Sequence, residues 1–136
     1  MNPHSRQLGP IIIYFLKTAR FSEKEIALLT YDTRLFHDLD LFGDTAENIL
    51  EILQREFNVD MSSFKFDKYF PTEYSQDVKH IDKLNTLLFF KFNAIARKHF
   101  LNIKEKVDGI YANYRPITLH MIEMSIREKK WADSIE

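Results

Sequence analysis

The stretch from Asp44 to Asn58 constrains the fold more than any other part of the chain. Its apolar residues recur three or four positions apart and therefore share one side of a helix: Ala46, Ile49, Leu50, Leu53 and Phe57. Asp44 is a favourable N-cap residue, Glu47 stands three residues later as in a capping box, and Asn58 is a suitable helix end. The sequence thus predicts an amphipathic helix whose apolar side packs against a core.

Shorter helical patterns lie on both sides of this segment. The chain has only three glycines and four prolines but twelve phenylalanines, so few residues break helices and large rings are available for a core. We expect a helix over 8–20 with Pro10 in its first turn, a helical turn after the capping box of Ser22 and Glu25, one or two turns around 66–70, and a last helix over 119–130 capped by Thr118. These patterns predict an all-α fold in a single domain spanning residues 1–136.

The region between these elements is less regular. We expect loops over 30–43 and 72–79, a long helix over 84–100 and a turn over 109–116. The run Leu87-Leu88-Phe89-Phe90 also suits a strand. The apolar stretch from Leu87 to Lys106 carries basic residues, so it fits a core helix whose lysines reach water, a partner's groove or a membrane surface. We favour the core.

Charge is divided unevenly along the chain, although the net charge is only -1. The segment Asp32–Asp77 holds eleven acidic and four basic residues, whereas the segment Val78–Glu136 holds eleven basic and seven acidic residues. An acidic middle segment repels phosphates and attracts cations, so it disfavours nucleic acid and favours a basic protein partner.

Several classes of site are disfavoured by the residues present. The chain has no cysteine, which excludes disulfides and thiolate metal sites. The apolar run Ile11–Leu16 is shorter than the core of a secretory signal or the ~20 residues of a membrane span, so we expect a cytoplasmic protein. Asp38 and Asp40 stand as at the start of a calcium loop, but Phe42 and Ile49 occupy positions that need oxygen ligands. We therefore expect no metal and no cofactor. No heptad pattern requires a dimer.

The segment Leu35–Met61 reads LFHDLDLFGDTAENILEILQREFNVDM and resembles the central segment of acyl carrier proteins. That family has an Asp-Leu pair, a Gly- or Asp-Ser-Leu junction and a Glu-rich helix ending in Glu-Glu-Phe. With Asp38-Leu39 and Glu56-Phe57 aligned, Gly43 stands where the family carries its modified serine, and a slip of one residue places Asp44 there. Neither residue has a hydroxyl, so the resemblance implies the family's helical bundle without its prosthetic arm.

A second resemblance covers more of the chain. The same segment, the run FKFDKYFP over 64–71, the run RPITLHMI over 115–122 and the residues KWAD over 130–133 resemble a bacterial family of unknown function described as acyl-carrier-protein-like and lacking the serine. The stretch between Pro71 and Arg115 is poorly matched. This resemblance implies an acyl-carrier-protein-like small helical bundle with an added long helix or hairpin between residues 80 and 115. It implies that the helix after Asp44 is exposed, and it implies no activity.

The strongest candidate site is the acidic side of that helix. In acyl carrier proteins the helix after the serine offers carboxylates to basic patches of partner enzymes, and the resemblance implies the same use of Asp44, Glu47 and Glu51, with Phe42 as an apolar neighbour. Outward charges of this kind steer encounter and set specificity. We therefore predict a non-enzymatic protein-interaction module whose partner-binding residues are Phe42, Asp44, Glu47 and Glu51.

Two alternatives remain open. The first is a genuine acyl carrier modified at an atypical hydroxyl, for which Thr45 is the nearest candidate in the sequence. The second is a small hydrolase-type enzyme that uses His37 with a nearby carboxylate as a general base. A catalytic base also needs a nucleophile and an oxyanion stabiliser, and no motif in the sequence supplies them. The second alternative predicts a polar-lined cleft around His37.

Overall fold

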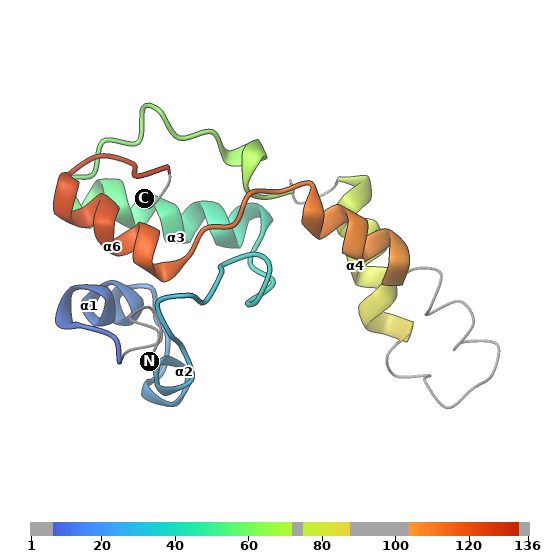
Figure 1. Cartoon of the computed structure of the whole chain (residues 1–136), viewed down its shortest axis with the longest axis horizontal. Coiled ribbons are helices and arrows are strands. Elements are labelled where there is room, and N and C mark those ends of the chain that lie inside the picture. Colours follow the sequence, from blue (N-terminus) through green and yellow to red (C-terminus); the bar gives the residue numbers. More distant parts are fainter. Residues whose placement is uncertain (1–6, 72–74, 88–103, 134–136) are drawn as a thin grey trace.

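The computed structural model describes residues 7–71, 75–87 and 104–133 (Figure 1). Within these ranges the ordered elements are helices, and pairing between extended segments is limited to single bridges. The helices are α1 (Pro10–Thr18), α2 (Glu23–Ala27), α3 (Gly43–Phe57), the short 3-10 helix η2 (Phe66–Lys68), α4 (Gln76–Leu87), a helix whose described part covers residues 104–112, and α6 (Leu119–Glu128). The prediction of an all-α fold is confirmed.

Helix α1 begins as the sequence predicts, with Pro10 in its first turn, where a missing N–H has no helical partner to lose. Its buried residues Ile12, Phe15 and Leu16 join a core to which α3 and α6 also contribute. The capping box of α2 is present in full, because Ser22 Oγ accepts from Glu25 N at 3.1 Å and Glu25 Oε1 accepts from Ser22 N at 2.8 Å. Local sequence thus determines both starts.

Helix α3 has the predicted apolar side, and its residues Ala46, Ile49, Leu50, Ile52 and Leu53 are buried. Asn58 ends the helix in the left-handed conformation, as its residue type favours. The predicted N-cap is wrong, however. Gly43 has a φ of 57°, a region that favours glycine, and the helix begins there with Phe42 as the residue before it. Asp44 therefore lies inside the first turn, where its charge still suits the helix dipole.

Helix α6 and the residues after it close the core. Thr118 caps α6 as predicted, since its hydroxyl accepts from Met121 N at 3.2 Å. Beyond α6 the chain runs beside the segment after α3: Asp60 N donates to Lys129 O at 2.9 Å and Trp131 N donates to Asp60 O at 3.0 Å. Trp131 is buried. These bonds tie the C-terminal segment to the residues that follow α3.

Helix α4 and the helix over 104–112 form an arm that extends to one side of α1, α3 and α6 (Figure 1). Buried apolar residues join the arm to the main core: Ile81, Val107 and Ile110. Two predictions are wrong here, because α4 begins at Gln76 within the expected loop and the second helix continues through Gly109 to residue 112. The helical hairpin expected between 80 and 115 agrees with the described ends of this arm. Most of the predicted 84–100 helix and of the Leu87–Lys106 stretch lies outside the described residues.

Candidate functional site

Three carboxylates lie along the solvent side of α3, and we call Asp44, Glu47 and Glu51 the acidic face. They are spaced by three and four residues, so they lie on neighbouring turns of the same side of the helix. All three residues are exposed. The apolar positions between them turn inward and fix the orientation of the helix. The structure therefore brings together three of the four residues that the sequence predicts.

Phe42, the fourth predicted residue, lies differently. It precedes α3 in an extended conformation and is half-buried. Its ring packs edge-on against Phe36, with ring centroids 6.3 Å apart. A ring placed in this way supports the start of α3, and only part of it faces solvent beside the acidic face.

Glu51 of the acidic face is paired with a neighbouring arginine through an exposed contact. Arg55 Nη1 lies 3.9 Å from Glu51 Oε1, and its Nε donates to Glu56 at 3.2 Å. Both pairs are well exposed, so water screens them and each contributes little. Glu47 makes no ion pair with any residue that the structure describes. The carboxylates of Glu47 and Glu51 therefore keep most of their negative charge toward solvent.

A hollow of about 230 Å³ borders the acidic face on one side. Its exposed lining residues are polar and its buried or half-buried ones are apolar, so its rim is polar and its floor and walls are apolar. The lining residues are Glu47, Leu50, Glu51, Gln54, Met61, Phe64 and Phe66. We call this the apolar hollow. The residues after α3 thus add a feature to the candidate site that the sequence reasoning missed.

A second, larger groove of about 390 Å³ lies between the end of α1 and α3. It is more polar, and its lining includes both positively and negatively charged side chains. The lining residues are Thr18, Ala19, Arg20, Thr45, Asn48, Ile49, Glu51, Ile52 and Arg55. Thr45, the hydroxyl of the acyl-carrier alternative, is exposed in this wall. Gly43, the position aligned with the serine, is buried.

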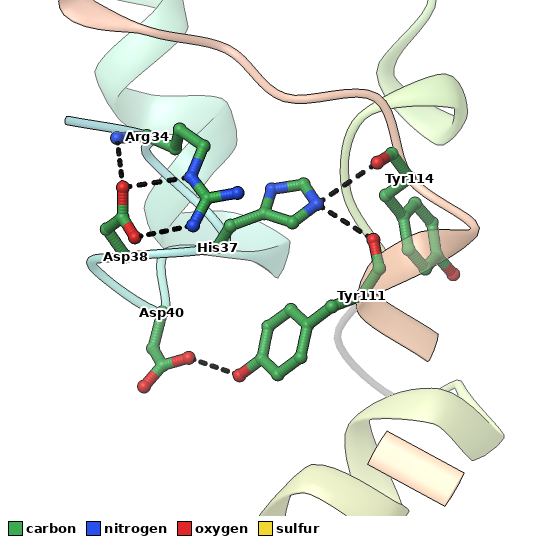
Figure 2. Close-up of polar contacts among 6 residues, drawn as sticks. All are labelled: Arg34, His37, Asp38, Asp40, Tyr111 and Tyr114. Carbon is green, nitrogen blue, oxygen red and sulfur yellow. Dashed lines mark hydrogen bonds and ion pairs between the residues drawn. The ribbon is translucent and has the colours of Figure 1, made fainter. Parts of the chain in front are cut away.

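A second cluster of polar side chains joins the loop before α3 to the arm (Figure 2). His37 Nε2 lies 2.8 Å from the carbonyl oxygen of Tyr111 and 3.1 Å from that of Tyr114. Because carbonyl oxygens only accept, Nε2 carries the proton in this arrangement. The other ring nitrogen, Nδ1, is buried and has no hydrogen-bond partner among the residues that the structure describes. The ring thus fastens the arm to the loop, and the lining of neither hollow described above includes it.

The acidic residues beside His37 are also engaged. Asp38 accepts two side-chain bonds from Arg34, at 2.8 and 3.0 Å, and a bond from the Arg34 backbone N–H. These bonds hold the pKa of Asp38 below its ordinary value. Asp40 accepts from the Tyr111 hydroxyl at 2.5 Å, and burial together with this carboxylate raises the pKa of Tyr111 well above its ordinary value (Figure 2). Among the described residues no group of three His, Asp or Glu side chains is arranged to hold a metal ion.

Comparison with known proteins identifies the family of this chain. The model of a family described as proteins of unknown function, DUF1493, matches residues 6–132. The chain belongs to this family. Neither curated proteins nor solved structures give a match. The predicted membership of a family of unknown function is thereby confirmed, while none of these comparisons indicates a relationship to acyl carrier proteins.

The family match spans both the acidic face and the arm, so it includes the Pro71–Arg115 stretch that the sequence resemblance matched poorly. In the described ranges of this family member, no helix is long and apolar enough to cross a membrane. The apolar hollow was missed because its two walls come from different elements. The aromatic run from Phe64 to Phe70 was the available indication, but only the tertiary structure shows which of its rings face outward.

Proposed function

We propose that this chain is a non-enzymatic protein-interaction module that binds a basic protein through the acidic face of α3. The observation that carries the proposal is the placement of Asp44, Glu47 and Glu51 on one solvent-facing side of a well-anchored helix. A rigid array of like charges attracts lysine- and arginine-rich surfaces, speeds encounter and rejects acidic proteins.

The anchoring of α3 supports this use. The helix gains its stability from its buried side, where Leu53 is fully inaccessible and Ala46 nearly so. The outward carboxylates are therefore not required for packing. A surface that contributes little to folding is available for recognition, and its geometry stays fixed when a partner binds.

The sequence resemblance supports the same use by analogy. In acyl carrier proteins the helix after the modified serine presents carboxylates to basic patches of partner enzymes. In this chain the aligned position is Gly43, whose left-handed φ of 57° suits glycine. The proposed module keeps the charged helix and dispenses with a prosthetic arm.

The test is capture of a partner by tagged protein from the cells that make it. Glu47→Lys combined with Glu51→Lys reverses the charge of the acidic face, and we expect this variant to lose the partner that the wild type retains. The matched control is Glu105→Lys with Glu128→Lys, because these exposed acids lie on other helices and give the same change in net charge.

The control variant should retain the partner, and both variants should unfold near the wild-type temperature. A partner that the reversed variant holds as well as the wild type does would contradict the proposal. A partner lost equally from both variants would show a general charge effect, and this too would contradict a specific acidic face.

A further inference from the structure

The apolar hollow beside the acidic face has the composition of an anchor site. Leu50 forms its floor and is only 4% exposed, while Met61, Phe64 and Phe66 are half-buried around it. An apolar protein cavity of about 150 Å³ accepts a benzene molecule. The hollow, at about 230 Å³, has room for one large apolar side chain.

The walls of the hollow are held in place from behind. Phe64 stacks on Tyr69 with ring centroids 5.2 Å apart and meets Trp131 edge-on at 4.9 Å. Phe66 stacks on Phe70 at 5.0 Å. Tyr69, Phe70 and Trp131 are buried, so they support the rings from the core side.

Backbone bonds fix the same segment. Asp60 exchanges backbone hydrogen bonds with Lys129 and Trp131, which ties the start of the wall to the C-terminal segment. The side chain of Asp60 also accepts from Ser62 N at 2.9 Å, between the wall residues Met61 and Phe64. A preformed hollow of this kind costs a ligand little ordering of the protein.

The rim determines what kind of partner fits. Glu47 and Glu51 lie on the edge of the hollow as well as on the acidic face, and Gln54 is the other polar residue of the rim. An apolar centre with a charged rim is the usual arrangement of an interface hot spot. The charge complementary to this rim is positive.

We propose that the apolar hollow seats one large apolar side chain of a partner segment, and that lysine or arginine residues on either side of it pair with Glu47 and Glu51. This inference rests on the proposed function and specifies the partner: a basic segment with a single apolar anchor. Purely charged polylysine-like segments lack the anchor and bind more weakly.

The test uses two synthetic fluorescein-labelled peptides, one with a phenylalanine between lysine pairs and one with alanine in its place. We expect the wild type to bind the phenylalanine peptide about tenfold more tightly by fluorescence anisotropy, because the ring is buried on binding. Equal affinity for the two peptides, or no measurable binding of the phenylalanine peptide, would overturn the inference.

Two sets of variants separate the anchor from the charges. Met61→Asp adds a negative charge but makes the hollow polar, so the tenfold preference should disappear while binding of the alanine peptide is kept. Leu28→Asp is the matched control, since Leu28, directly after α2, is 84% exposed, and it should keep the preference. Glu47→Gln with Glu51→Gln should weaken the binding of both peptides and leave the ratio of their affinities unchanged.

The anchor site and the proposed function can be contradicted independently of each other. The charge variant could weaken the binding of both peptides while the phenylalanine peptide binds no more tightly than the alanine peptide. This result would support the proposed function and contradict the anchor site. If neither peptide responds to the charge variant, the proposed function itself falls. Should Met61→Asp not fold, the methyl resonance of Met61 in wild-type protein decides: it should shift with the phenylalanine peptide and stay in place with the alanine peptide.

Discussion

The two sides of α3 differ in what they contribute. The inward side, with Ala46, Leu50 and Leu53, is buried in the core shared with α1 and α6. The outward side carries the acidic face, and the pairs that Arg55 makes there with Glu51 and Glu56 are exposed and weak. The comparison shows that one side of the helix is buried for folding while the other is left to solvent, where the proposed function places partner binding. Changes on the inward side should alter stability, and changes on the outward side should alter binding.

The largest expected effect is on the inward side. Leu53→Ala removes buried methyl groups from the centre of the core, so it should lower the free energy of unfolding by about 2–5 kcal/mol. Urea denaturation measures the change. Gln54→Ala, at the exposed neighbouring position, should change stability by less than about 0.5 kcal/mol. Similar losses for the two variants would remove the contrast between the two sides.

The start of α3 gives an effect of intermediate size. Gly43→Ala forces a Cβ into a left-handed conformation, which should cost about 1–2 kcal/mol of stability. The same substitution at Gly109 offers a control in which stability should rise instead of fall, because this helical glycine is exposed and an added Cβ meets nothing within 4 Å. Gly109→Ala should stabilise by about 0.5–1 kcal/mol. Thermal unfolding of both variants checks the pair, and a stabilised Gly43→Ala protein would contradict the conformation of Gly43.

A smaller effect concerns the loop that precedes α3. The pKa of Asp38 is lowered by its bonds from Arg34, so the carboxylate stabilises the fold above its unfolded pKa of about 4, and this stabilisation is lost as pH falls through the lower folded value. The pair is partly exposed, which limits its contribution to below about 1 kcal/mol. Asp38→Asn should therefore be less stable than wild type at neutral pH, with the difference shrinking toward pH 3. A difference that grows on acidification would contradict this pairing.

The smallest expected effect on stability belongs to the acidic face. Glu47→Lys with Glu51→Lys should change the free energy of unfolding by no more than about 0.5 kcal/mol, because both side chains are exposed and the Glu51–Arg55 pair is weak. Denaturant titration of this double variant and of Leu53→Ala compares their free energies of unfolding. A loss as large as that of Leu53→Ala would show that the outward side is structural.

The parts of the fold that local sequence controls were predictable. The apolar spacing of α3, the capping box at Ser22 and the cap at Thr118 need only neighbouring residues, and all three are present. The turn expected from Gly109 was wrong because an exposed glycine costs a helix only about 1 kcal/mol, which surrounding packing outweighs. The exposed positions of Asp44, Glu47 and Glu51 on one helix also follow from the helical period. The apolar hollow could not be predicted, because its wall depends on the pairing of Asp60 with residues near Lys130, far away in the sequence.

Recognition of a basic partner by the acidic face is tested best by calorimetry, which measures the affinity of the captured and purified partner. We expect wild-type affinity to fall as salt rises, since screening weakens exposed charge pairs. The Glu47→Lys and Glu51→Lys double variant should bind at least tenfold more weakly at low salt, while the Glu105→Lys and Glu128→Lys control binds as wild type does. Equal affinity of the wild type and the reversed variant at low salt would contradict the claim.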